Sequence, residues 1–371
     1  MKLNYAAQVR KFAFEHPLLS AILVQVTFWV IAFLLLGLIL HFNALATGSI
    51  HFIEVQLSFT PILIFCALIG LLYGILLGCS DFYLSKNWLK VKSPGLIILI
   101  KTSYYFIVML IMFLIVKNVV WEMVLHPTYF KNIILSLPSK AWQYYYYLTL
   151  VYVLFMSVVV SFVIQISSKF GPGILIPLLL GKYSKPQEEE RAFIFVDLKS
   201  STTHAENLGH FRYSSLIRDC FLNINHISVK YGAEIYQYVG DEIVLSWPVK
   251  HVKDLSVCID FFFACQDDFV KRKNKFIKKY NILPEFKAGL HLGVVTAVEV
   301  GDVKRELAYH GDTLNVAARI QEKCNECGAD LIISEDFKKT LKSNIYHFES
   351  LELASLRGRE EQMRIFKVSR V

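Results

Sequence analysis

The sequence predicts an α-helical membrane domain with four transmembrane helices, followed by an α+β domain with a ferredoxin-like order of elements. Three observations predict this division. The 371-residue chain is 54% hydrophobic with a mean hydropathy of +0.44, which is too apolar for an ordinary soluble protein. Of its 39 Lys and Arg and 31 Asp and Glu residues, only 13 and 4 fall in residues 1–185. The second half, in contrast, is well charged and opens with a β-α-β-β-α-β pattern of hydrophobic periodicity.

Four apolar stretches are long enough to cross about 30 Å of hydrocarbon. They are residues 18–40, 60–79, 94–116 and 146–166. We therefore expect a transmembrane domain at 1–166, a connector at 167–191 and a soluble domain at 192–371. The lipid bilayer is then a partner of the first domain.

Positively charged residues flank these stretches asymmetrically. Those expected on the inner side are Lys2, Arg10, Lys11, Lys86, Lys90, Lys92, Lys169, Lys182 and Lys185. Because short loops rich in Lys and Arg stay inside, we expect a multi-pass protein of the inner (cytoplasmic) membrane with its second half in the cytoplasm. Lys117, Lys131 and Lys140, in the second outer loop, run against this rule.

The net charge and the cysteines argue against two classes of protein, and one lysine lies within an apolar stretch. The net charge of +8 divides into +9 on residues 1–185 and −1 on residues 186–371, so we expect no nucleic-acid partner. The 7 Cys form no regular framework, which favours a reducing compartment. Lys101 lies within the third apolar stretch, and we favour a lysine that snorkels to the interface over a buried functional site.

The soluble half shows a mixed α+β pattern. Strands are expected at 193–198, 234–239, 243–247, within 286–300 and at 331–334, and helices near 211–230, 254–279 and 313–323. This order alone carries no information about chemistry.

The most informative feature is a pair of acids at strand ends. Asp197 closes the strand in "FIFVDLKSST", and Asp241 lies in the turn of "YQYVGDEIVLSW". Either acid alone is as readily explained by turn chemistry. If the two strands are neighbours, however, both carboxylates emerge at one edge and can hold two divalent cations about 3.5 to 4 Å apart. We assign Asp197, Leu198 and Asp241 to this metal site.

Two further groups of residues point to a phosphorylated substrate. Small hydroxyl residues follow Asp197 in "LKSST", which opens toward a helix, and the main-chain N–H groups there could hold phosphate oxygens. The residues assigned to this role are Lys199, Ser200, Ser201 and Thr202. In "YHGDTLNVAARIQ", Asn315 and Arg319 are four residues apart and project from one helical face. A helical arginine is more often a solvated charge, but a planar guanidinium also suits a developing charge at phosphorus.

Taken together, "FVDLKSST", "VGDE" and "GDTLNVAAR" resemble the class III nucleotidyl cyclase catalytic domain over about residues 188–371. The membrane part is similar to that of membrane-anchored bacterial cyclases. The resemblance implies that Asp197 and Asp241 bind two Mg²⁺ or Mn²⁺ ions, that Asn315 positions the ribose and that Arg319 stabilises the transition state. It also implies a basic residue for the terminal phosphates, at Arg359 or Arg357, and a homodimer that shares its sites.

The positions that resemble the family's base-selecting pair depart from its pattern. They are Gln237, where the family has lysine, and Ala308, where it has Asp or Thr. A glutamine amide can donate to adenine N1 and accept from its amino group, so we expect ATP as substrate and cyclic AMP as product. The alternatives are a cyclase that uses GTP or a pyrimidine triphosphate, and a silent nucleotide-binding membrane scaffold. A diguanylate cyclase is disfavoured because its "GGDEF" turn is absent.

Overall fold

The structure of the chain is a computed structural model that describes residues 9, 12–13, 15–50, 59–87, 92–123, 139–170, 180–342, 345–351 and 363–370. The chain divides into two compact units. One contains Glu15–Leu175, and the other contains Ile176–Val371 together with Met1–Phe14. The predicted connector at 167–191 includes residues 171–179, which lie outside the described residues.

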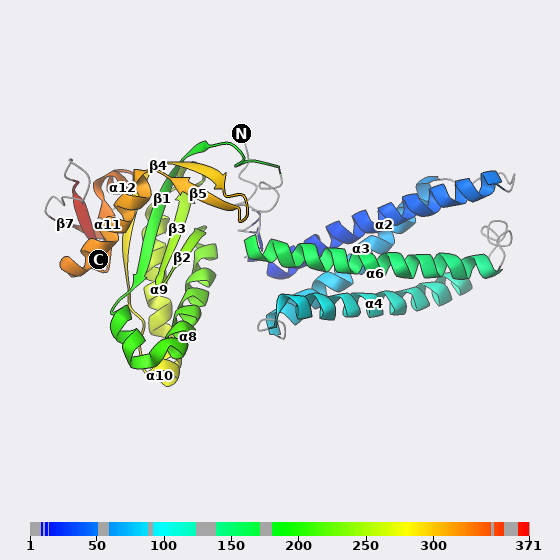
Figure 1. The fold of residues 1–371 in the computed structure, drawn as a ribbon, viewed down its shortest axis with the longest axis horizontal. Coiled ribbons are helices and arrows are strands. Elements are labelled where there is room, and N and C mark those ends of the chain that lie inside the picture. Colours follow the sequence, from blue (N-terminus) through cyan, green and yellow to red (C-terminus); the bar gives the residue numbers. More distant parts are fainter. Residues whose placement is uncertain are drawn as a thin grey trace. The chain divides into compact units, whose positions relative to one another are not determined.

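The first unit contains the four predicted apolar helices, which run alongside one another (Figure 1). They are α2 (Pro17–Ile50), α3 (Phe59–Asn87), α4 (Pro94–Met123) and α6 (Ser139–Phe170). Each includes a stretch of 22 to 27 residues with a mean hydropathy of 2.2 to 2.7, long and apolar enough to cross a membrane. Large apolar side chains such as Ile31, Leu72 and Phe155 are 58% to 65% exposed, as expected for surfaces that face lipid.

Helices α2 and α3 pack closely because α3 presents a row of glycines to α2. A Cβ atom on Gly74 would lie 2.5 Å from Cα of Val26, and one on Gly78 would lie 2.4 Å from Cα of Ile22. Gly70 meets the α2 main chain in the same way. Small residues at such spacing allow two membrane helices to approach at backbone distance.

The change Gly74→Ala is expected to destabilise the helix pair by about 1 to 3 kcal/mol, the usual cost of overpacking. Gly95→Ala in α4 is the matched control, because nothing lies within 4 Å of the added Cβ. Alanine is the better helix former by about 1 kcal/mol, so this control should be neutral or stabilising. Thermal unfolding of both variants in micelles measures the difference, and equal midpoints would contradict the close packing.

The second unit is built on an eight-stranded sheet with the order β2-β3-β1-β4-β6-β8-β7 and with β5 paired to β4 (Figure 1). Its strands are β1 (Gln187–Leu198), β2 (Glu234–Val239), β3 (Glu242–Pro248), β4 (Phe286–Val300), β5 (Glu306–His310), β6 (Leu331–Ser334), β7 (Tyr346–Ser350) and β8 (Ile365–Arg370). The β4–β6 pair is parallel and the other pairs are antiparallel. The order β2-β3-β1-β4 is that of the predicted ferredoxin-like arrangement.

The helices of this unit are α8 (Ser201–Lys230), α9 (Ser256–Lys271), α10 (Lys273–Tyr280), α11 (Asp312–Glu326) and α12 (Glu335–Lys339). Two differ from expectation. α8 begins ten residues before the predicted start at residue 211, with a break at Gly209, where φ is 69°. The helix predicted near 254–279 is divided at Arg272 into α9 and α10.

Both faces of the central sheet are buried. In β1, Ile194 and Val196 belong to the cluster that contains α8 and α9, whereas Phe193 and Phe195 pack on the other face with Ala317 of α11. Successive strand residues point to opposite faces, so this continuous apolar run fills two layers at once. Packing on both faces of the sheet therefore fixes the position of the end of β1.

Candidate active site

Two acids lie at the same edge of the sheet. The antiparallel pairing of β1 with β3 places Asp197 directly opposite Glu242, and Asp241 immediately precedes Glu242 in the β2–β3 turn. The predicted adjacency of the two strands is thus confirmed.

Asp197 is held by side chains from two other elements. Its Oδ2 accepts a hydrogen bond from Nε2 of Gln321 at 3.0 Å and lies 3.2 Å from Nζ of Lys287. The same ammonium donates to Oδ1 of Asn325 at 3.0 Å. Burial and the charge of Asp241 raise the pKa of Asp197, against the opposing effect of Lys287 and Gln321. The carboxylate is therefore fixed in place by α11 and β4.

Glu242 adds a third acid to this edge. Burial, together with the charges of Asp197 and Asp241, raises the pKa of Glu242 to about 7. Such a concentration of carboxyl groups is a place where a bound cation offsets unfavourable charge. The oxygen donors of these acids therefore fit a hard divalent metal.

The remaining metal ligands have to come from outside these side chains. Among the residues that the structure describes, no three His, Cys, Asp or Glu side chains form a ready-made cage. Leu198 is buried, at 1% exposure, and its side chain has no donor atom, so only its main-chain carbonyl could serve as a metal ligand. Mg²⁺ is commonly bound by one or two carboxylates with water and substrate phosphates completing its shell.

The predicted phosphate-binding residues lie at the start of α8. Ser200 is the N-cap residue in a left-handed conformation, with φ at 53°, and Ser201 and Thr202 form the first turn. First-turn N–H groups have no acceptor within a helix, so they are available to an anion. The ammonium of Lys199, however, forms an ion pair with Asp330. This pair is partly exposed and therefore weak, and a phosphate role for Lys199 requires it to open.

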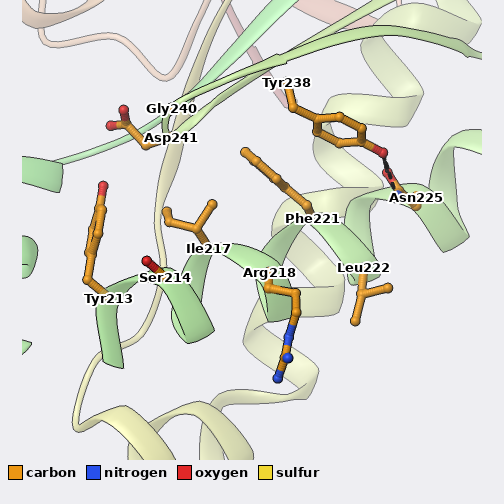
Figure 2. Close-up of a pocket in the computed structure, with 10 residues that line it drawn as sticks. All are labelled: Tyr213, Ser214, Ile217, Arg218, Phe221, Leu222, Asn225, Tyr238, Gly240 and Asp241. Carbon is orange, nitrogen blue, oxygen red and sulfur yellow. Dashed lines mark hydrogen bonds between the residues drawn. The ribbon is translucent and has the colours of Figure 1, made fainter. Parts of the chain in front are cut away.

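A surface groove of about 570 Å³ lies between α8 and the β2–β3 turn (Figure 2). Its lining residues are Tyr213, Ser214, Ile217, Arg218, Phe221, Leu222, Asn225, Tyr238, Gly240 and Asp241. Figure 2 shows Asp241 and Tyr213 near one end, and Asn225 with Tyr238 near the other. The amide of Asn225 and the hydroxyl of Tyr238 exchange hydrogen bonds of 2.8 and 3.1 Å. Asp241 therefore borders an open hollow and is not sealed in the core.

The two predicted base-contacting positions are on strands that approach one another. Gln237 is exposed on β2 and Ala308 is half-buried on β5, a strand that the sequence did not predict. Their sequence neighbours pack together: the rings of Tyr236 and Tyr309 are 4.9 Å apart, and the N–H of Tyr309 donates to the Tyr236 hydroxyl at 3.3 Å. The structure thus brings β2 and β5 of one chain together.

Helix α11 carries Asn315 and Arg319, as predicted. Asn315 is exposed and Arg319 is half-buried, and neither has a hydrogen bond or ion pair among the described residues. Gln321, which contacts Asp197, is two residues after Arg319 and therefore lies about 200° around the helix from it. The arginine consequently lies on the side of α11 that faces away from its own chain's Asp197.

Two predicted site residues are not described by the structure, and three residues at the site were not predicted from the sequence. Arg357 and Arg359 lie outside the described residues. Glu242, Lys287 and Gln321 were not predicted. Glu242 had a local signal, since it adjoins Asp241 in "GDE", whereas the other two come from elements distant in sequence.

Sequence comparison identifies the second unit. A family model described as the adenylate and guanylate cyclase catalytic domain matches residues 183–369, half of the chain. The chain belongs to the class III adenylate and guanylate cyclase family. The cyclase domain thus follows four apolar helices, as the resemblance implied.

Individual relatives include both kinds of cyclase. Adenylate cyclase 2 of Rhizobium meliloti (strain 1021) is 31% identical over 221 residues, which cover 59% of this chain and 61% of the relative. A soluble guanylate cyclase of Caenorhabditis elegans is 22% identical over 184 residues, which cover 48% of this chain and 25% of the relative. The chain thus spans less than two thirds of either relative.

A solved structure supports the same fold. The structure of a bacterial light-regulated adenylyl cyclase aligns with a TM-score of 0.51 at 20% sequence identity. The alignment covers 58% of this chain and 64% of that structure. At this identity the likeness concerns the fold alone.

Proposed function

We propose that the chain is a membrane-bound adenylate cyclase that converts ATP to 3′,5′-cyclic AMP and pyrophosphate. The observation that carries this proposal is the meeting of Asp197 and Asp241 at one sheet edge, in a domain of the cyclase family. The silent-scaffold alternative is disfavoured because both acids, Asn315 and Arg319 are all present.

The reaction is an in-line displacement at the α-phosphorus. The ribose 3′-oxygen forms a bond to that phosphorus while the bond to the α,β-bridging oxygen breaks, so pyrophosphate leaves and the hydroxyl proton is released. Two Mg²⁺ or Mn²⁺ ions, when bound, would activate the hydroxyl and neutralise the triphosphate. Asp197, Asp241 and the carbonyl of Leu198 would hold them, and the first turn of α8 would bind phosphate oxygens.

We propose that each site is shared between two chains of a homodimer. Because Gln321 contacts Asp197, Arg319 on the far side of α11 is directed away from the acids of its own chain. A second copy related by two-fold symmetry would supply Asn315 and Arg319 to those acids, and two equivalent sites would result. In this arrangement Asn315 positions the ribose and Arg319 stabilises charge on the transferring phosphoryl group.

The direct experiment uses the purified chain with Mn²⁺ and each of the four ribonucleoside triphosphates in turn. Mass spectrometry identifies the cyclic product. We expect cyclic AMP from ATP as the main product. A main product from GTP or a pyrimidine triphosphate would establish the alternative substrate, and no product from any of the four would contradict cyclase activity.

Base selection by Gln237 makes a separate prediction. Gln237→Glu removes the amide donor to adenine N1, so use of ATP should lose about 1 to 3 kcal/mol of transition-state stabilisation relative to other triphosphates. Gln187→Glu, the same change at the far end of β1, is the control. An unchanged preference among the four triphosphates would show that Gln237 does not face the base.

The side of the membrane is also a proposal, supported by the positive flanks of the apolar helices. With the cyclase domain in the cytoplasm, where ATP is available, a reporter enzyme fused after Val371 should be active only there. A fusion active only in the periplasm would overturn the orientation. The comparison needs one cytoplasmic and one periplasmic reporter on the same full-length chain.

A further inference from the structure

The membrane unit contains a buried ion pair. Lys101 of α4 and Asp81 of α3 are each 6% exposed, and Nζ of Lys101 lies 3.0 Å from Oδ2 of Asp81. The expectation that Lys101 snorkels to the interface is therefore wrong: a nearby carboxylate stabilises the charge inside the helix bundle. Buried ionisable groups within membrane helices are costly and are typical of functional sites.

The ion pair belongs to a polar cluster in which one carboxylate oxygen of Asp81 has several donors and the other has none among the described residues. Oδ2 of Asp81 also accepts hydrogen bonds from Nε2 of Gln25 and from the hydroxyl of Tyr105, both at 2.6 Å. Oε1 of Gln25 in turn accepts from Nε1 of Trp29 at 3.0 Å. The other oxygen of Asp81, Oδ1, is buried and has no hydrogen-bond partner among the described residues. A buried acceptor without a partner is unfavourable and calls for a donor.

A cavity of about 440 Å³, which is open to the surface of this unit, adjoins the cluster. Residues of all four helices line it: Pro17, Ser20, Ala21, Val24, Gln25, Asp81, Phe82, Ser85, Lys101 and Ile164. The lining therefore includes a carboxylate, an ammonium, an amide and two hydroxyl groups, and the other five lining residues are apolar. Polar groups set among apolar side chains are the usual composition of a small-molecule site.

The charges of the cavity restrict the class of ligand. Asp81 and Lys101 already neutralise each other, so neither an anionic nor a cationic head would find a net opposite charge in the cavity. A neutral hydroxyl group, in contrast, donates to a carboxylate and accepts from an ammonium at the same time. The apolar wall and the surrounding helices favour a ligand that reaches the cavity from lipid.

We propose that this cavity is a binding site for a neutral, lipid-soluble molecule with a hydroxyl head. The hydroxyl donates to the carboxylate of Asp81 and accepts from Nζ of Lys101, and the apolar body packs against Val24, Phe82 and Ile164. Two sources have this chemistry, a glycerolipid without phosphate and a quinol. This site lies in the membrane unit and is independent of the proposed substrate of the cyclase domain.

The test measures saturable binding to the full chain in phosphatidylcholine nanodiscs. Tritiated 1-monooleoylglycerol and decylubiquinol are the hydroxyl probes, and methyl oleate and decylubiquinone are their counterparts without a hydroxyl donor. We expect at least one hydroxyl probe to bind about tenfold more tightly than its counterpart, the effect of one hydrogen bond to a charged group. Preferential binding of 1-monooleoylglycerol alone assigns a glycerolipid, and preferential binding of decylubiquinol alone assigns a quinol. No saturable binding, or equal binding of each pair, would overturn the proposal.

A variant that leaves the polar cluster intact locates the binding. Ala21→Leu places a larger side chain in the cavity and should weaken binding of the hydroxyl probe at least about tenfold. Ala46→Leu in α2 is the same change at an exposed residue that does not line the cavity. Asp81→Asn should also weaken binding, but it disturbs the ion pair, so Ala21→Leu decides the result. Wild-type affinity in Ala21→Leu would show that the probe binds elsewhere.

Discussion

Replacement of either Asp197 or Asp241 by alanine should lower turnover at least about a hundredfold, the scale expected for loss of a major electrostatic contribution at a metal site. Each carboxylate offsets cation charge beside a triphosphate, and a methyl group cannot do so. Initial rates of cyclic nucleotide formation with Mn²⁺ measure the loss. Asp302→Ala, in the exposed segment between β4 and β5, should retain wild-type activity.

Asp197 also has a structural role that this experiment must separate. Its removal leaves Lys287 and Gln321 without their shared acceptor, so Asp197→Ala is expected to lose stability as well as activity. Asp197→Asn retains an oxygen for both donors and loses only the charge. A folded Asp197→Asn protein with near-normal activity would contradict the two-metal mechanism.

The sequence predicted the elements whose signals are local. Strands β2 and β6 have the predicted limits, and the apolar helices contain the predicted stretches. The start of α8 was missed because "STTHAENLGH" has no apolar periodicity before Phe211. Strand β5 was missed because it is a short strand that pairs with β4 alone. Its formation depends on a tertiary neighbour and not on a pattern of its own.

The residues of the candidate site likewise divide into those with a local sequence signal and those that depend on tertiary contacts. Asp197 was predicted because it closes a recognisable strand and Asp241 because it lies in the turn between two such strands, and their proximity was expected if those strands are neighbours. The contacts of Lys287 and Gln321 with Asp197 join residues 90 and 124 positions apart, respectively, and no local pattern indicates them. The burial of Lys101 likewise depends on Asp81 in another helix. Hydropathy shows that the charge of Lys101 is unfavourable within an apolar stretch, but it does not identify Asp81 as the partner that stabilises this charge.

The shared-site proposal predicts that two inactive variants restore each other. Asp197→Ala and Arg319→Ala should each be nearly inactive alone, because every site of either homodimer has one lesion. In a mixed dimer, one site carries both lesions and the other carries neither. With equal expression and random pairing, half of the dimers are mixed and half of their sites are intact, so co-expression should restore about a quarter of wild-type activity.

A second pair of variants controls for recovery by any other route. Asp197→Ala and Asp241→Ala remove acids of the same half-site, so each site of their mixed dimer keeps one lesion and no activity should return. Differently tagged chains, purified in tandem, isolate the mixed dimers, whose activity should then reach about half of the wild-type value for the first pair. Inactive mixed dimers of Asp197→Ala with Arg319→Ala would mean that Arg319 serves the acids of its own chain. The position of Arg319 away from Asp197 on α11 predicts the opposite result.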